Sequence, residues 1–301
     1  MSETLFYLDT ATPYEQQLLW AQWRHCITSP PPVMCQDFFS DSGQSLEDFV
    51  YVLWRFVEKN QAACLQQLLE AIAALKTLRL GERFEAFWQL AFYWHPDYTI
   101  LTNNFAIRTQ ERTLGELDLL VLHIPSQRHF HLELAVKFYL GVGSASSHQH
   151  WVGPGLQDRL DNKLSKLKDH QLSLLQMEQS QQMMLSHGWN DIESYSIIRG
   201  NLFTQLASSL MPSSGHHFWA EKNVWLNIFE EQSYDWIELD KSMWLSPYPV
   251  KPKESVSLRS IEPRYSDYPV AIAAIKNNKE IVRGFIVDSQ WEEKALKYSE
   301  S

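Results

Sequence analysis

Carboxylate and lysine side chains interrupt two apolar stretches near the middle of the chain. The stretch GELDLLVLHI carries Glu116 and Asp118, and the stretch FHLELAVKFYL carries Glu133 and Lys137. Carboxylate oxygens are ligands of Mg²⁺, which often takes one or two of them together with substrate phosphate and water. A lysine nearby could stabilise negative charge that develops on a phosphate ester. These residue types indicate metal-assisted phosphodiester chemistry.

Both stretches read as β-strands, in which successive side chains point to opposite faces. The alternation puts His131, Glu133, Ala135 and Lys137 on one face of the second strand. Glu133 and Lys137 are about 13 Å apart along a strand, which is too far for a direct ion pair. Each therefore needs a partner elsewhere, and a shared divalent cation is one such partner. The alternative is a half-exposed sheet whose charges are solvated.

The elements that must position these residues follow from hydrophobic periodicity. Helices are predicted over residues 13–28, 46–76 (one helix or two), 80–95 and 156–176. Strands are predicted over residues 98–108, 115–124, 130–140 and 194–203. The first of these strands has a hairpin turning at Asn103–Asn104 as its alternative. From residue 80 the order is helix, three strands, helix, strand, which predicts an α/β fold with a mixed sheet flanked by helices.

Short connections decide how neighbouring strands pair. Only a turn at Pro125–Arg128 separates the two charged strands, whereas parallel neighbours need a crossover of a dozen or more residues. We therefore expect an adjacent, antiparallel pair. A second hairpin is expected around Asn277–Asn278, followed by a short C-terminal helix. The chain is divided into an N-terminal helical region (1–77), a core (78–245) and a small accessory unit (246–301).

The charged strands carry a resemblance to a known superfamily. The segment GELDLLV, followed by an acid and a lysine in the next strand, resembles the PD-(D/E)XK nucleases, whose core is described as α-β-β-β-α-β. The resemblance implies that Asp118 and Glu133 hold Mg²⁺ or Mn²⁺, with Glu85 of LGERFE as a further ligand and Glu82 as a second choice. It also implies that Lys137 orients the attacking water or stabilises developing charge.

A second resemblance, to another family, extends over most of the chain. The segments DRLDNKLSKLKDHQ, RGNLF and WLSP resemble an uncharacterised bacterial family of unknown function that is assigned to the same superfamily. One departure from the superfamily pattern concerns the third strand. The common pattern is acid-x-Lys, but here Ala135 stands two residues before Lys137 and the acid, Glu133, stands four before it. The acid keeps its face and moves about 6.6–6.8 Å along the strand.

Other polar residues have weaker claims to function. Arg159 and Lys163, on the helix after the sheet, could contact a phosphate backbone, although a solvated helix face is the alternative. His148 and His150 have a spacing that can bind zinc, but no third ligand set accompanies them. The tryptophans from residue 219 to residue 244 are expected in the core and not as platforms for stacking bases.

Bulk composition excludes some classes of protein. The chain has 301 residues, of which 45% are hydrophobic and 21% charged, typical of a globular protein. Its apolar runs are too short to span a membrane, and no signal peptide is expected. Three widely spaced cysteines indicate reduced thiols and a cytoplasmic location. The net charge of −10 disfavours non-specific binding of nucleic acid, so any such binding needs a local basic surface.

Two hypotheses follow. The first is a metal-dependent phosphodiester hydrolase of the nuclease type that acts on DNA or RNA. The second is the same fold without catalysis, serving as a binding or scaffold module. The displacement of the acid to Glu133, with Ala135 in its usual place, is the feature that separates them.

Overall fold

The chain forms two compact units. The computed structural model describes residues 12–32, 37–77, 79–109, 112–206, 217–230, 234–247 and 268–300. Unit 1 comprises Met1–Val136 and Leu164–Arg199, and unit 2 comprises Lys137–Lys163 and Gly200–Ser301. Strands β3 (Arg128–Gly141) and β5 (Ile192–Gln205) contribute residues to both units. The three-part division drawn from the sequence stays a prediction.

Helices open the described part of unit 1. They are α2 (Pro13–Thr28), the short α3 (Phe38–Asp41), α4 (Leu46–Lys59), α5 (Gln61–Ala73) and α6 (Leu80–Trp94). Thr12 starts α2 with a capping box, in which its side chain and that of Glu15 each accept a backbone N–H of the other residue. The helices predicted over residues 13–28, 46–76 and 80–95 are confirmed, and residues 46–76 form two helices, separated at Asn60.

The sheet of unit 1 contains β1 (Tyr98–Arg108), β2 (Thr113–His123) and parts of β3 and β5. β1 pairs with β2, and β2 with β3, both antiparallel, which confirms the adjacency predicted for the charged strands. β1 is one continuous strand, so the hairpin reading of residues 98–108 was wrong; Asn104 adopts a φ of 48° within the strand.

The last strand of this sheet, β5, is parallel to β3. Arg128 contacts Glu193, and three residues further along β3 the ring of His131 contacts Ser194. The contacts advance in the same direction along both strands. The sheet is therefore mixed, and unit 1 has an α/β fold with helices on its faces.

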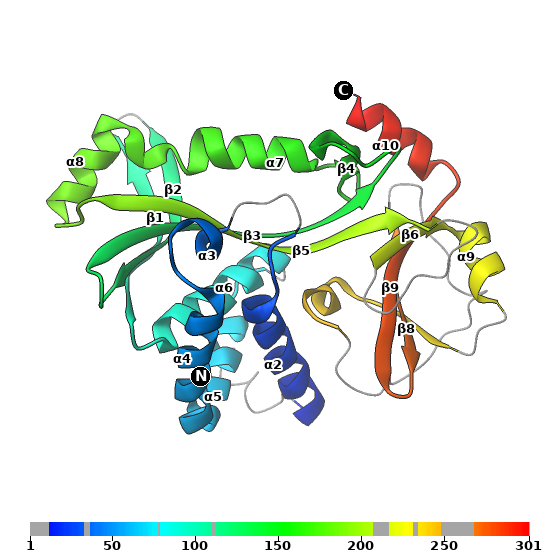
Figure 1. Ribbon diagram of the computed structural model, residues 1–301, viewed down its shortest axis with the longest axis horizontal. Helices are drawn as coiled ribbons and strands as arrows, with labels where there is room; N and C mark the ends of the chain where they lie inside the picture. Colours follow the sequence, from blue (N-terminus) through cyan, green and yellow to red (C-terminus); the bar gives the residue numbers. More distant parts are fainter. Residues whose placement is uncertain are drawn as a thin grey trace. The chain divides into compact units, whose positions relative to one another are not determined.

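The two faces of β3 meet different layers of unit 1. On one face the ring of Phe130 lies 5.1 Å from that of Phe38 in α3, which in turn lies 6.4 Å from the ring of Phe92 in α6. Figure 1 shows α6 gathered with α2, α4 and α5. On the other face Ala135 clusters with Leu167 and Ile198. The segment after α7 (Leu160–Lys166) thus covers the face that carries His131 and Glu133.

The helix predicted over residues 156–176 is shorter and interrupted. α7 ends at Lys166, a π-helical turn follows over Leu167–Gln171, and a 3₁₀ turn occupies Leu174–Gln176. The backbone N–H of Leu172 donates to the carbonyl of Leu167, at 2.8 Å, which closes the wider π turn. α8 (Glu178–Ser186) then leads to β5.

Unit 2 has its own mixed sheet, in the order β5-β6-β9-β8-β7. Its elements are β4 (Trp151–Val152), β6 (His217–Glu221), α9 (Lys222–Phe229), β7 (Asp235–Glu238), β8 (Val270–Lys276), β9 (Lys279–Val287) and α10 (Trp291–Ser299). The hairpin predicted around Asn277–Asn278 and the C-terminal helix are confirmed, whereas β6 and β7 were not predicted. Most of the connection expected over 246–269 lies outside the described residues.

Several tryptophans lie in the cores. Trp219 and Trp225 are fully buried and Trp236 nearly so, which fits the core role predicted for them. Trp225 and Trp236 meet edge to face, with ring centroids 4.9 Å apart. Across the ranges that the structure describes, no helix is long and apolar enough to cross a membrane.

Candidate functional site

Asp118 and Glu133 lie on neighbouring strands of unit 1, close to where their ladder ends. The register of β2 and β3 runs from His123–Arg128 to Leu119–Leu132. The ladder thus ends one residue short of Asp118 on β2 and of Glu133 on β3. Asp118 Oδ2 accepts a hydrogen bond of 2.9 Å from the backbone N–H of Leu134, the residue that follows Glu133. The Asp118 side chain thus accepts a backbone hydrogen bond from β3 directly beside Glu133.

Glu133 is the most enclosed of the predicted site residues. Its side chain is 1% exposed, and both carboxylate oxygens accept hydrogen bonds. The ring Nε2 of His131 lies 3.0 Å from Oε1, and the amide of Gln171 donates to Oε2. His131 is itself fully buried, and its Nδ1 lies 3.1 Å from the hydroxyl of Ser194. His131 thus links Glu133 of β3 to Ser194 of β5 through its two ring nitrogens.

Gln171, the last residue of the π-helical turn, belongs to this network. Such turns recur at functional sites. Leu167, at its start, is buried against Ala135, which anchors the turn over the polar face of β3. Gln171 at its end is half-buried and reaches Glu133.

The two carboxylates of Asp118 and Glu133 supply some of the oxygen ligands that a hard divalent cation needs. Two carboxylates on adjacent strands are what Mg²⁺ or Mn²⁺ usually takes from a protein, the remaining ligands being water or phosphate. Among the described residues no three His, Cys, Asp or Glu side chains are grouped so that they could hold an ion. Glu85 lies half-buried on α6, a helix that packs on β1 and β2. The ligand roles of Glu85, Asp118 and Glu133 stay predictions.

Lys137 belongs to unit 2, where its ammonium pairs with the carboxylate of Asp158. The hydroxyl of Tyr139 also donates to Asp158 Oδ2, at 3.3 Å. Both members of the ion pair are about one-third exposed, so the pair is accessible to solvent and to a polar ligand. The catalytic role predicted for Lys137 is untested, and Asp158 was not predicted as its partner.

The residues predicted to contact nucleic acid also lie in unit 2. Arg159 makes two hydrogen bonds to Asp161, of 2.8 and 2.9 Å, and donates to the carbonyl of Tyr298 in α10. The hydrogen bonds from Arg159 lower the pKa of Asp161. Lys163 follows on α7 and is half-buried. Their role in binding nucleic acid stays a prediction.

Some residues of the site were missed from the sequence. His131 shares the polar face of β3 with Glu133, and that alternation was the available signal. Gln171 had only a weak signal: it follows the stripe of Leu164 and Leu167 at helical spacing, but nothing in the sequence pairs it with Glu133. For His150, the ring contacts Ser147, at 3.1 Å, and no zinc ligand set forms around it in the part of the chain that the structure describes.

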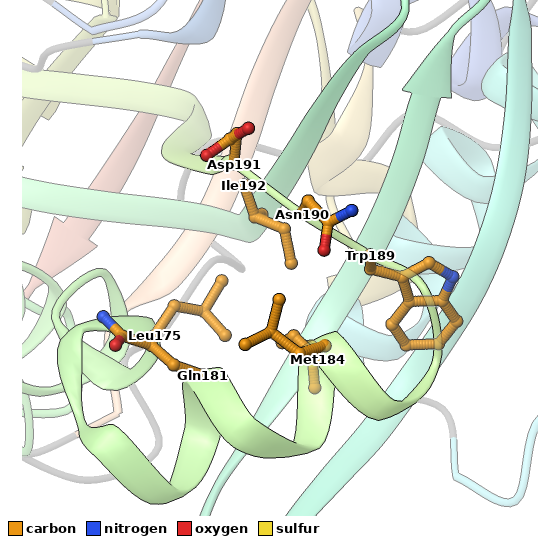
Figure 2. Close-up of a pocket in the computed structure, with 8 residues that line it drawn as sticks. Leu175, Gln181, Met184, Trp189, Asn190, Asp191 and Ile192 are labelled. Carbon is orange, nitrogen blue, oxygen red and sulfur yellow. The ribbon is translucent and has the colours of Figure 1, made fainter.

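A separate cavity of about 350 Å³ lies between α8 and the start of β5 (Figure 2). It is lined by Leu175, Gln181, Met184, Leu185, Trp189, Asn190, Asp191 and Ile192. Figure 2 shows the side chains of Leu175 and Ile192 directed into it. The ring of Trp189 stacks on His187, with centroids 4.7 Å apart. None of the predicted site residues lines this cavity.

The mixed sheet flanked by helices defines this chain as an α/β protein. Asp118 and Glu133 lie on two adjacent strands of that sheet. Comparison with protein families identifies it further: the chain belongs to the family described as Domain of unknown function (DUF1853), which matches residues 22–293. No curated protein and no solved structure matches it.

Proposed function

We propose that this protein is a metal-dependent phosphodiester hydrolase of the nuclease type, acting on nucleic acid. One observation carries the proposal. Asp118 and Glu133 lie on adjacent antiparallel strands within the order α6, β1, β2, β3, α7, β5, with β5 parallel to β3. That order is the one expected of the PD-(D/E)XK core. The acids of that core occupy the corresponding strands.

Each residue's proposed role follows from its charge. Asp118 and Glu133 would hold Mg²⁺ or Mn²⁺, with Glu85 as a further candidate ligand. A bound divalent cation polarises a phosphoryl oxygen and lowers the pKa of a bound water. Lys137, on the same strand as Glu133, would supply positive charge to the phosphate or orient the water. His131 would hold Glu133 in place, as partners of metal ligands commonly do.

The test is a cleavage assay on the purified protein. Labelled single-stranded, duplex and branched DNA, and RNA, are incubated with Mg²⁺, Mn²⁺ or a chelator. We expect cleavage that needs the metal and is lost in Asp118→Asn and Lys137→Ala. The matched control is Asp169→Asn, an exposed acid on the π-helical turn, which should cleave normally. No cleavage on any substrate, or equal cleavage by Asp118→Asn, contradicts the proposal.

A second candidate function is favoured by the contacts of the same residues. Both oxygens of Glu133 already accept hydrogen bonds, and Lys137 is paired with Asp158. A fold of this kind that has lost catalysis would serve as a binding module. It predicts saturable binding of one of the same nucleic acids, without metal dependence and without cleavage.

A further inference from the structure

A cavity of about 200 Å³ in unit 1 is formed by residues of α2, α4 and the start of α5. It is lined by Trp20, Arg24, Trp54, Val57, Glu58 and Gln61. We infer that this cavity binds a guanine nucleotide, with the base stacked on tryptophan and the phosphate at Arg24. The inference does not depend on the proposed hydrolase, because none of the acids or the lysine proposed for catalysis lines the cavity.

Two helices bring the same kind of residue pair to the cavity. Trp20 and Arg24 are four residues apart on α2, and Trp54 and Glu58 are four residues apart on α4. Residues at this spacing lie on one face of a helix, one above the other. Each helix therefore presents an indole ring with a charged group beside it, and the two charges are of opposite sign.

Aromatic ring surface is available at the cavity. Trp23 is fully buried, and its indole N–H donates to the carbonyl of Phe87, at 3.1 Å. The ring centroid of Trp23 lies 5.1 Å from that of Trp20 and 5.1 Å from that of Trp54, and these two outer tryptophans are only half-buried. A buried, hydrogen-bonded ring thus supports two partly exposed ones. Every nucleobase has a flat face that can stack on such a ring.

The polar side chains select among the bases. Glu58 and Gln61 are exposed, and neither side chain makes a hydrogen bond or ion pair within the described ranges. An ionised carboxylate only accepts hydrogen bonds. Guanine alone has two adjacent donors on its Watson–Crick edge, N1–H and the N2 amino group, so its edge matches the two oxygens of Glu58. The amide of Gln61 can donate to guanine O6, which is an acceptor.

Arg24 supplies positive charge for the phosphate. Its guanidinium carbon lies 5.5 Å from the ring centre of Trp54, so a base stacked there has a cation beside it. Arginine binds phosphate through two parallel N–H donors. Arg24 and Glu58 both line the cavity but form no ion pair with each other in the structure described. Both charges are therefore available to a ligand.

The test is isothermal titration calorimetry of the full-length protein with GMP, AMP, CMP, UMP and guanosine. A chelator is present throughout, so that the proposed metal site takes no part. We expect GMP to bind about tenfold more tightly than AMP or more, because a bidentate contact to a base edge discriminates by about this factor. Guanosine, which lacks the phosphate, should bind more weakly than GMP.

Variants assign each part of the nucleotide to its side chain. Glu58→Gln should lose the preference for GMP over AMP, and Arg24→Gln should bind GMP no more tightly than guanosine. Trp54→Leu, which keeps an apolar side chain, should bind all four nucleotides about tenfold more weakly, because stacking does not distinguish bases. The matched control is Glu47→Gln, an exposed acid in the first turn of α4, which should bind as the wild type does. Thermal melts show whether Trp54→Leu folds.

Three results would overturn the inference: no binding of GMP, equal binding of the four nucleotides, or a preference for GMP that persists in Glu58→Gln. Each leaves the proposed hydrolase untouched, because that activity is measured separately, with metal. The source of the nucleotide is tested with an RNA tetramer that begins with guanosine 5′-phosphate. Displacement of GMP by the tetramer supports binding of a nucleic-acid end, and GMP binding without displacement supports a free nucleotide as the ligand.

Discussion

At the scale of single residues, Asp118 has a structural task besides its proposed catalytic one. Its carboxylate accepts the backbone N–H of Leu134. We expect Asp118→Asn, which keeps an acceptor, to unfold in urea at a similar denaturant concentration to the wild type without metal. Asp118→Ala removes the acceptor and should lose about 1–3 kcal/mol of unfolding free energy. An equal loss in both variants would show that the charge itself stabilises the fold.

His95, at the end of α6, gives the fold a pH dependence. Burial lowers its pKa from 6.5 to about 4, against the opposing charge of Asp97. Below about pH 6.5 the histidine is protonated in the unfolded chain but stays neutral in the folded protein. The contribution of neutral His95 to the free energy of unfolding is therefore complete above about pH 6.5 and declines as the pH falls toward 4. The decline should reach about 3 kcal/mol, at 1.36 kcal/mol for each unit of pKa.

The measurement is the free energy of unfolding in urea as a function of pH. Between pH 6.5 and pH 4, the free energy of unfolding should depend less on pH in His95→Gln than in the wild type. His170→Gln, which replaces an exposed histidine, should leave this pH dependence unchanged. An unchanged slope in His95→Gln would mean that other groups cause the acid sensitivity.

At the scale of elements, one glycine permits β5 to approach β3 in unit 2. Gly200 has a φ of +127°, and a Cβ there would lie 1.7 Å from the carbonyl oxygen of Lys137. We expect Gly200→Ala to destabilise the protein by more than about 3 kcal/mol, because a strained φ and a backbone clash combine. The measurement is thermal or urea unfolding.

Gly188 supplies the matched comparison. It also has a positive φ, +77°, but no atom lies within 4 Å of an added Cβ. Gly188→Ala should therefore cost only about 1 kcal/mol, the strain of the backbone alone. Similar losses in the two variants would contradict the close approach at Gly200.

Elements with strong local signals could be predicted from the sequence. Thr12 and Pro13 start α2, and two asparagines with φ of 53° and 60° turn the hairpin at Asn277–Asn278. The π-helical turn carries no such signal, since the choice between i→i+4 and i→i+5 bonding depends on tertiary contacts. The helical spacing of Gln171 from Leu164 and Leu167 predicts the face that it shares with them, although not its contact with Glu133. The contact of Lys137 with Asp158 likewise joins residues 21 apart, through a loop that has no periodic pattern.

At the scale of the whole molecule, the two units are interleaved in sequence, and periodicity does not reveal this. β3 and β5 each run from unit 1 into unit 2, so neither unit is a continuous segment. The predicted boundary near residue 77 precedes the first helix of the expected core, and the one near residue 245 precedes a Pro- and Ser-rich stretch. Composition changes mark linkers, whereas interleaved units share strands and have no linker between them.

Net charge sets how the whole protein should meet nucleic acid. At −10, only a few local basic contacts can bind phosphate. Each contact should weaken duplex binding about threefold when salt rises from 50 to 200 mM, so two contacts predict a loss of about tenfold. Lys163→Gln should reduce the slope of log affinity against log salt by about 1. Binding that is insensitive to salt would exclude phosphate contacts as its source.

A divalent cation held by Asp118 and Glu133 is the central claim, and a thermal melt with and without Mn²⁺ tests it most directly. A ligand that binds only the folded state stabilises it by about 2.7 kcal/mol when present at 100 times its dissociation constant. The wild type should therefore melt at a higher temperature with Mn²⁺, Lys137→Ala should show the same shift, and Asp118→Ala combined with Glu133→Ala should show none. The absence of a shift in the wild type, or an equal shift in the double variant, would contradict the claim.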